Sequence, residues 1–398
     1  MELLGKSRED LRAYCKGLGE PAYRGDQIYH WLYAEREFAI DRMSNLPGAF
    51  RDKLGRAATI NVPVVRQRYV SADGSVRYLF ALDEGKTNAE LRGGAESAEN
   101  NRARRPAAVE AVFMPSDGRQ TICVSTQAGC AVDCQFCLTA QLGLIRNLSA
   151  GEIVTQVLLP LKEMESVAGK ESGPAKEERP ASEGEPYRSE SEKGLAARTN
   201  VVLMGQGEPL LNFENVMAAL RILLDPEGVG LSPKHVTLST SGIVPGIEKF
   251  GKEPMRSKLA ISLNASCDER RDVLMPINKK YPLKALMEAC RNYPLRNWEH
   301  LTFEYVMLGE VNDTAEDARR VVRLLAPLKS VKVNLIPWNP GELPYKESSA
   351  EAIEEFRRIL TEKGVPAFVR YSRGRDVMAA CGQLALKEVK ESPLRVVG

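Results

Sequence analysis

The chain has 398 residues, a formal net charge of +2 and a charged fraction of 27%. This length suits a large α/β domain with a small accessory domain, and the weak positive charge permits RNA binding without requiring it. No apolar run is as long as a membrane-spanning helix, and the N-terminus lacks the apolar core of a signal peptide. We therefore expect a cytoplasmic protein that does not contact membranes. We also expect a monomer, although these features do not bear on the oligomeric state.

Residues 1–60 have the pattern of a small helical domain. Ser7 can cap a helix that ends at Gly17, and residues 23–35 place apolar side chains along one helical stripe. A third short helix is expected at 49–58. Together these segments predict an N-terminal accessory domain with its own apolar face.

Residues 61–107 are predicted to contain a hairpin followed by a flexible linker. Apolar and polar residues alternate over 64–82, and Asp73-Gly74 provides the turn. Residues 84–107 are polar and low in complexity, which is typical of a flexible insertion in a loop.

Short apolar strands alternate with amphipathic helices through most of the remaining chain, over 108–390. The expected strands are 120–126, 200–205, 235–241, 258–264, 301–308, 331–338 and 367–372. Repeated β-then-α units predict an α/β fold with a parallel sheet, and polar residues at most strand ends favour a partial (β/α) barrel of about six strands. Residues 163–199 interrupt this pattern, and their Glu, Lys, Ser, Pro and Gly content predicts a disordered insertion.

Three of the eight cysteines form a C-x3-C-x2-C motif directly after the first of these strands: Cys130, Cys134 and Cys137. Three thiolates can hold three irons of a 4Fe–4S cluster and leave the fourth iron open to a ligand. Phe136 would shield such a cluster from solvent. A zinc site is the alternative, but no second cysteine pair or histidine pair follows to complete it.

Polar residues and glycines follow several strands, at the rim where a barrel carries its chemistry. The second strand ends in GQGEP, where Gly207 lets backbone approach a ligand and Glu208 can accept from an amine. Hydrogen-bonding residues also end later strands, namely Ser239, Ser262, Asn264 and Asn339. Each alone is equally compatible with an ordinary strand end, so the prediction of a binding site rests on their sharing one rim.

Two cysteines and one glutamate are further candidates. Cys123 lies in the first barrel strand and Cys381 follows the last, so both can reach the barrel mouth. A free cysteine is more often a small buried hydrophobe than a nucleophile. Glu110 lies among apolar residues before the first barrel strand, and is either a surface charge or a partly desolvated base.

The motifs together resemble the RlmN/Cfr family of radical S-adenosylmethionine (SAM) RNA adenine methyltransferases, and RlmN more closely. The resemblance covers most of 108–388 and lies in the strings TICVSTQAGCAVDCQFC, MGQGEPLLN, VTLSTSG, AISLNA, PINKKYPL, EYVML, NLIPWNP and RGRDVMAACGQL. YRGDQIYHWLY and NLPGAFRDKL resemble the family's accessory helical domain. The expected fold is therefore the radical SAM partial barrel.

This resemblance implies a role for each candidate. Cys130, Cys134 and Cys137 would ligate the 4Fe–4S cluster. Two SAM molecules per turnover would bind at Gly207, Glu208, Ser239, Ser262, Leu263, Asn264 and Asn339. In the family mechanism, SAM methylates Cys381, a radical activates that methyl group, and its carbon adds to adenine. Glu110 would then accept the ring proton, and Cys123 would attack the sulfur of Cys381 to release the RNA through a transient disulfide.

The implied substrate is C2 of an adenine in 23S rRNA and in tRNA, with a flavodoxin-type electron donor. Two groups of basic residues would meet RNA phosphates or are ordinary surface charges: Arg24, Arg51 and Lys53, and Arg370, Arg373 and Arg375. The alternatives are Cfr-like methylation at C8, a radical SAM enzyme with a non-RNA substrate, and an iron–sulfur or zinc RNA-binding protein without catalysis.

Overall fold

The computed structural model describes residues 1–82, 107–116, 118–171 and 198–384. Most of the two predicted insertions, 84–107 and 163–199, lies outside these ranges. Within the described part, no helix is both long and apolar enough to cross a membrane.

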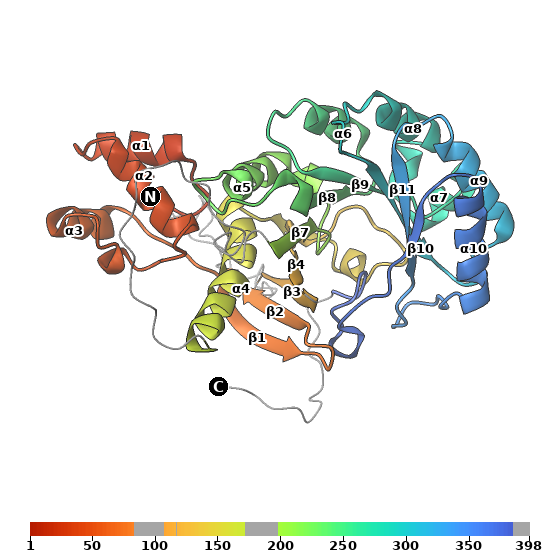
Figure 1. Ribbon diagram of the computed structural model, residues 1–398, viewed down its shortest axis with the longest axis horizontal. Helices are drawn as coiled ribbons and strands as arrows, with labels where there is room; N and C mark the ends of the chain where they lie inside the picture. Colours follow the sequence, from red (N-terminus) through yellow and green to blue (C-terminus); the bar gives the residue numbers. More distant parts are fainter. Residues whose placement is uncertain (83–106, 117, 172–197, 385–398) are drawn as a thin grey trace, which may run out of the picture.

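The predicted N-terminal helices are present as α1 (Arg8–Gly17), α2 (Tyr23–Tyr33) and α3 (Gly48–Ala57), at one end of the molecule (Figure 1). Ser7 and Asp10 form a reciprocal capping box at the start of α1, as the sequence indicated. The Tyr29 hydroxyl donates to Asp225 at 2.9 Å, so this helical unit is tied to the larger domain.

A single mixed sheet forms the larger domain, in the order β1-β2-β3-β4-β7-β8-β9-β10-β11-β12. Neighbours from β1 to β4 are antiparallel, and neighbours from β4 to β12 are parallel. The strands are β1 (Val64–Val70), β2 (Val76–Ala81), β3 (Ala108–Ser116), β4 (Arg119–Cys123), β7 (Thr199–Leu203), β8 (Val236–Thr240), β9 (Lys258–Ser262), β10 (Leu301–Met307), β11 (Val331–Pro337) and β12 (Ala367–Val369), while β5 (Gln127–Gly129) and β6 (Leu144–Asn147) pair separately. The predicted parallel partial barrel is therefore confirmed.

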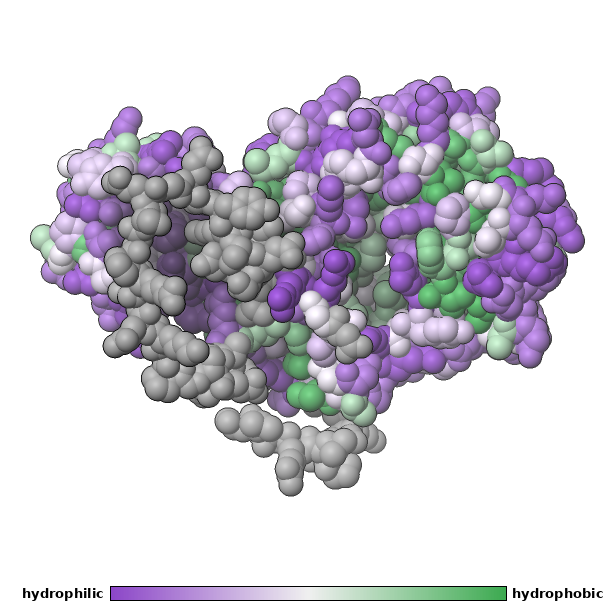
Figure 2. Space-filling view, viewed as in Figure 1, coloured by the Kyte–Doolittle hydropathy of each residue, from purple (hydrophilic) through white to green (hydrophobic). Residues whose placement is uncertain are grey.

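Helices lie along the outside of the curved sheet (Figure 1). They are α4 (Ala150–Glu171), α5 (Phe213–Leu224), α6 (Val244–Gly251), α7 (Asp268–Leu274), α8 (Leu283–Asn292), α9 (Ala315–Leu325) and α10 (Ala350–Glu362). Their apolar stripes face the strands: the Phe356 ring of α10 packs on Tyr305 of β10 with the ring centres 5.0 Å apart. Hydrophilic side chains cover the outer rim formed by α8, α9 and α10 (Figure 2).

Two boundaries differ from the predicted ones. The predicted hairpin is present as β1-β2, but it extends the main sheet through β3 instead of forming a segment separate from the catalytic domain. Helix α4 continues to Glu171, so the prediction of disorder is wrong for residues 163–171. Ion pairs and hydrogen bonds hold this polar end of the helix, because Glu163 accepts from the Tyr78 hydroxyl at 2.8 Å and Glu165 pairs with Arg36 at 2.8 Å.

The segment after β12 crosses to the hairpin at the other edge of the sheet. Asp376 accepts from the Ser71 hydroxyl at 2.6 Å, and the Gly374 N–H donates to Asp73 at 2.9 Å. These bonds anchor the loop that carries Cys381 to the hairpin turn.

Candidate active site

Two adjoining cavities lie on the inner side of the sheet. The first, here called the cysteine cavity, has a volume of about 170 Å³ and lies between the C-x3-C-x2-C loop and the carboxyl ends of β7 to β11. The second, here called the strand cavity, has about 550 Å³ and lies against the inner faces of β4 and β7 to β11. The predicted residues that line the cysteine cavity are Cys130, Cys134, Cys137, Gly207, Glu208, Ser239, Ser262, Asn264, Asn339 and Cys381.

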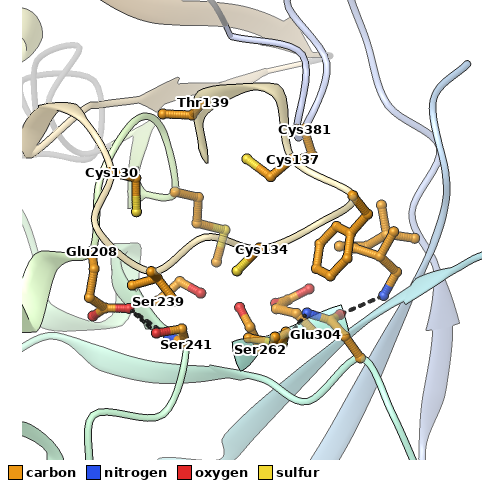
Figure 3. A pocket seen from close by; sticks show the side chains of 18 of the residues that line it. Cys130, Cys134, Cys137, Thr139, Glu208, Ser239, Ser241, Ser262, Glu304 and Cys381 are labelled. Carbon is orange, nitrogen blue, oxygen red and sulfur yellow. Dashed lines mark hydrogen bonds between the residues drawn. The ribbon is translucent and has the colours of Figure 1, made fainter. Parts of the chain in front are cut away.

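The cysteine loop is held on both sides by backbone hydrogen bonds. The Cys130 N–H donates to the Gly143 carbonyl at 3.0 Å, and the Gln135 N–H donates to the Leu274 carbonyl at 3.0 Å. Phe136 packs against Trp338, whose indole N–H donates to the Phe136 carbonyl at 3.3 Å. The loop therefore presents its thiols from a fixed frame, around the cavity shown in Figure 3.

The three thiols of this loop are the donors that a metal centre would use here. They come from one loop and line one cavity, so three irons of a 4Fe–4S cluster could each take one thiolate, whereas a structural zinc site has four protein donors. Burial raises the pKa of Cys130 to about 12 and that of Cys134 well above its ordinary value, so cluster binding must displace protons.

Glu208 is a fixed acceptor on the wall of the cysteine cavity. One carboxylate oxygen accepts from the N–H and hydroxyl of Ser241 at 2.6 and 2.7 Å, and the other accepts from the Leu210 N–H at 3.0 Å (Figure 3). Desolvation raises its pKa above the ordinary value while these bonds oppose the shift. A carboxylate buried in this way suits a cationic amine. Gly207, at φ +98°, has no room for a side chain because a Cβ would lie 2.5 Å from Gln127.

A buried guanidinium that the sequence analysis missed supports this rim. Arg271 of α7 is fully buried and donates to the carbonyls of Ser241 at 2.7 Å, Ser262 at 3.1 Å and Leu263 at 3.1 Å. Desolvation lowers its pKa to about 10. Its position in the helix DERRDVL gave no sign of this role, beyond lying between two strings of the resemblance.

Leu263 is the one predicted SAM residue whose side chain belongs to the hydrophobic core. It is fully buried and lines neither cavity. Its N–H donates to the Glu304 carbonyl at 2.9 Å, and its own carbonyl accepts from Arg271. These contacts make Leu263 part of the support of the rim.

Two asparagines complete the rim. Asn264 has a left-handed backbone, φ +55°, and its side-chain oxygen accepts from the Val306 N–H at 2.8 Å. Asn339 donates to the Ser372 hydroxyl at 2.9 Å and to the Cys381 carbonyl at 3.1 Å. The Asn339 Oδ1 atom is buried without a hydrogen-bond partner in the described structure. An acceptor of this kind fits a ligand that donates an amino or hydroxyl hydrogen.

Cys123 and Cys381 meet in the strand cavity although 258 positions separate them in the sequence. The Cys381 side chain borders both cavities, and desolvation by the residues around it raises the pKa of its thiol to about 11. Burial, and then the nearby Cys381, raise the pKa of Cys123. The loop carrying Cys381 is joined to the cysteine loop, because the Leu138 N–H donates to the Gly382 carbonyl at 2.8 Å.

Glu110 lies on β3, in the part of the strand that pairs with β2. It is fully buried, forms an ion pair with Arg77, and accepts from the Gln206 side chain at 3.4 Å. It lines neither the cysteine cavity nor the strand cavity. The surface-charge interpretation of Glu110 is therefore wrong, and its role as proton acceptor stays a prediction.

The two predicted groups of basic residues differ in position. Arg370 and Arg373 line the strand cavity, whereas Arg375 pairs with Glu347 at 2.9 Å. The basic residues of the helical domain are bonded locally, as when Arg51 donates to the Asp41 carbonyl at 2.6 Å. Of the six predicted basic residues, all of which are described, Arg370 and Arg373 therefore lie beside the candidate site.

Comparisons with known proteins agree with this architecture. Residues 1–60 match the Ribosomal RNA large subunit methyltransferase N-terminal domain, and residues 182–325 match the Radical SAM superfamily. The crystal structure of a radical SAM methyltransferase from Sphaerobacter thermophilus superposes with a TM-score of 0.80 at 35% identity, covering 96% of this chain and 99% of that one.

Full-length relatives extend the match. The "Probable dual-specificity RNA methyltransferase RlmN" of Koribacter versatilis is 46% identical, over 94% of this chain and 98% of the relative. The "Dual-specificity RNA methyltransferase RlmN" of an Anaeromyxobacter species is 42% identical, over 97% and 90% respectively.

The partial barrel and its cysteine loop define a radical SAM methyltransferase, a class that implies a 4Fe–4S cluster and SAM as cofactors. The two full-length relatives, which are more than 40% identical along nearly the whole chain, narrow this class to one family. The chain belongs to the RlmN family of RNA methyltransferases.

Proposed function

We propose that this protein methylates C2 of an adenine in 23S rRNA and in tRNA, in the cytoplasm. The observation that carries the proposal is the meeting of Cys123 and Cys381 in one cavity beside the three-cysteine loop. A radical SAM enzyme that does not transfer a methyl group through a cysteine has no need of this pair. The names of the relatives, dual-specificity RNA methyltransferases, support two RNA substrates. The choice of C2 over C8 rests on the closer resemblance to RlmN than to Cfr.

The rim residues would hold SAM. Glu208 offers a charged acceptor for its amino group, and Asn339 offers the unpartnered Oδ1 atom to its adenine or ribose. Ser239 and Ser262 supply hydroxyl groups between these two positions. A cluster held by Cys130, Cys134 and Cys137 would supply the electron that splits SAM and yields a carbon radical.

The two remaining cysteines would carry and release the methyl group. Cys381 borders both cavities, so its sulfur can meet SAM on one side and the RNA base on the other. Cys123 lies against the strand cavity, where it can attack the Cys381 sulfur after the carbon has been transferred. Its raised pKa means that this thiol must lose a proton as it attacks.

RNA would enter through the strand cavity. Arg370 and Arg373 supply positive charge there, and the exposed ring of Tyr371 offers a face on which a base can stack. A flavodoxin-type donor and a monomeric enzyme complete the proposal, and both rest on the family resemblance alone.

Anaerobic reconstitution with iron, sulfide and SAM tests this function. We expect a methyl group on Cys381 by peptide mass spectrometry, and 2-methyladenosine in digested 23S rRNA and tRNA. Cys381→Ala should keep the cluster's absorbance and lose RNA methylation. Cys123→Ala should accumulate enzyme covalently bound to RNA. Free methylated RNA produced by Cys123→Ala at the wild-type rate, or 8-methyladenosine as the product, would contradict the proposal.

A further inference from the structure

The strand cavity carries two lysines that the proposed function leaves unused. Lys258 is the first residue of β9 and Lys332 is the second residue of β11, and both line this cavity. His235 lines it as well, directly before β8. These three residues lie at the amino ends of their strands, whereas the carboxyl ends border the cysteine cavity. They are here called the lysine end of the strand cavity.

Polar side chains line the lysine end, although the interior of a barrel of parallel strands is normally filled by branched apolar residues. Thr237 of β8 pairs with Lys258, and Thr302 of β10 pairs with Lys332. Both threonines line the same cavity, which keeps a volume of about 550 Å³. Open volume between polar walls is typical of a binding site for a polar ligand.

Neither lysine forms an ion pair within the described part of the chain. Two carboxylates act on them from a distance, Glu299 on Lys258 and Glu304 on Lys332. Both carboxylates are bonded elsewhere, because Glu299 pairs with Arg256 at 3.4 Å and Glu304 accepts from a side-chain amide of β11 at 2.9 Å. Charges that are taken out of water are normally paired, so these half-buried ammonium groups lack a partner.

Further cations surround the two lysines. Desolvation lowers the pKa of Lys258, and the charge of Lys332 adds to this effect. Desolvation likewise lowers the pKa of Lys332, and the charge of Arg370 adds to it. Because like charges repel one another, an anion placed between these groups would relieve their repulsion.

His235 offers a hydrogen bond at the same place. Its Nδ1 atom is buried without a hydrogen-bond partner in the described structure. Desolvation, followed by the charge of Arg119, lowers the pKa of His235, so its ring is neutral at pH 7. A neutral imidazole can donate from Nδ1 to an oxyanion while Nε2 stays unprotonated. The lysine end thus combines two cations with a free donor, which are groups that bind phosphate.

The register of the sheet connects the lysine end to the site of methyl transfer. Cys123, Val202, Thr237 and Lys258 are paired in one row across β4, β7, β8 and β9. Neighbouring strands are about 4.8 Å apart, so this row spans roughly 14 Å along the curved wall. An extended lysine side chain covers part of that distance. The Lys258 ammonium can therefore contact the backbone of a nucleotide whose base lies beside Cys123.

We propose that the lysine end binds a phosphate group of the RNA backbone next to the target adenosine, an inference that rests on the proposed function. The two lysines contact the phosphate oxygens, and His235 donates a hydrogen bond to one of them. A free phosphate ion has the same oxygens, but Arg370 and Arg373 extend the positive charge along the cavity, which suits a chain of phosphates better. Binding of this phosphate fixes the nucleotide so that its base lies beside the two cysteines.

A double variant, Lys258→Met with Lys332→Met, tests this inference, because methionine keeps most of the side-chain length and removes the charge. In anaerobically reconstituted protein we expect a normal rate of Cys381 methylation, since that step needs no RNA. The KM for the RNA transcript should rise, with little change in the rate at saturating RNA. The slope of log affinity against log salt concentration should fall by about 0.7–1, the value for one phosphate contact. Thermal stability should not fall, because the variant loses two unpaired cations.

Lys363→Met is the matched control. Lys363 is exposed at the end of α10 and forms no ion pair with the described residues. The RNA affinity of this control and its salt dependence should equal those of the wild type.

RNA with a neutral linkage provides a second test. Single methylphosphonate linkages, placed in turn on either side of the target adenosine, each remove one backbone charge. One of them should weaken binding to the wild type and leave binding to the double variant unchanged, because that variant has already lost the contact.

Two results would overturn the assignment of the lysine end. One is an RNA affinity and salt slope of the double variant equal to those of the wild type; if millimolar inorganic phosphate then still raises the melting temperature of the wild type alone, the cavity binds a free anion. The other is an equal effect of every methylphosphonate on both proteins. Failure of the proposed function is distinguishable, because wild-type protein would then carry no methyl group on Cys381 and yield no methylated RNA.

Discussion

Replacing Arg271 with leucine should destabilise the protein and loosen the SAM site together. The guanidinium is fully buried and bonds three carbonyls at 2.7–3.1 Å and the Asn278 side chain at 3.0 Å. A hydrogen bond from a charged donor contributes about 1.5–3 kcal/mol, and buried acceptors left without a partner add a further cost. The costs of the separate hydrogen bonds do not add up in full, and leucine carries no charge, so the cost of burying the guanidinium disappears. We therefore expect a loss of about 3–5 kcal/mol in the free energy of unfolding.

Urea denaturation of the metal-free protein, followed by circular dichroism, measures this loss. Arg319→Ala is the matched control, because Arg319 is 55% exposed and its pairing with Glu316 at 3.5 Å should contribute less than about 1 kcal/mol. SAM affinity of the reconstituted protein should also fall in Arg271→Leu, since Ser241 and Ser262 lose the group that fixes their carbonyls. A change in unfolding free energy below about 1 kcal/mol, with unchanged SAM affinity, would refute the claim that Arg271 holds the rim.

Three further outcomes follow from the site. Gly207→Ala should lower SAM affinity and thermal stability, because a Cβ would lie 2.5 Å from Gln127 at a backbone φ of +98°, and Gly341→Ala, where a Cβ meets open space, is the control. Asn339→Leu should weaken SAM binding in equilibrium dialysis and slow the methylation of Cys381, because both the free acceptor and the bond to the Cys381 carbonyl are lost; equal rates in both proteins would contradict this. In the folded protein Glu304 has a pKa of about 7, against about 4.5 in the unfolded chain, so the folded state binds the Glu304 proton more tightly. The free energy of unfolding of the wild type should therefore fall between pH 5 and pH 8, and that of Glu304→Gln should change less over the same range. Parallel curves for the two proteins would disprove the pKa shift.

Local signals in the sequence were sufficient for the elements and for much of the site. The Ser7 cap, the Asp73-Gly74 turn and the alternation of strands with helices are written in neighbouring residues, and the structure confirms them. The cysteine spacing likewise placed three thiols on one loop.

Long-range pairing could not be predicted in the same way. The hairpin joins the main sheet because β2 pairs with β3, and no residue of the hairpin indicates this partner. Arg271 and Glu304 appear in the sequence as ordinary charged residues, and their burial depends on segments far away in the chain. Glu110 was recognisable as a family residue, but its ion pair with Arg77 depends on the antiparallel packing of β2 and β3.

Two hydrogen bonds join the cysteine loop to the loop that carries Cys381. Leu138 and Thr139 follow the last predicted cluster cysteine directly and donate to the carbonyls of Gly382 and Leu384, the latter at 2.7 Å. Because of these bonds, a displacement of either loop would be transmitted to the other. The thiols that would hold the cluster and the cysteine that would carry the methyl group are therefore positioned as one unit.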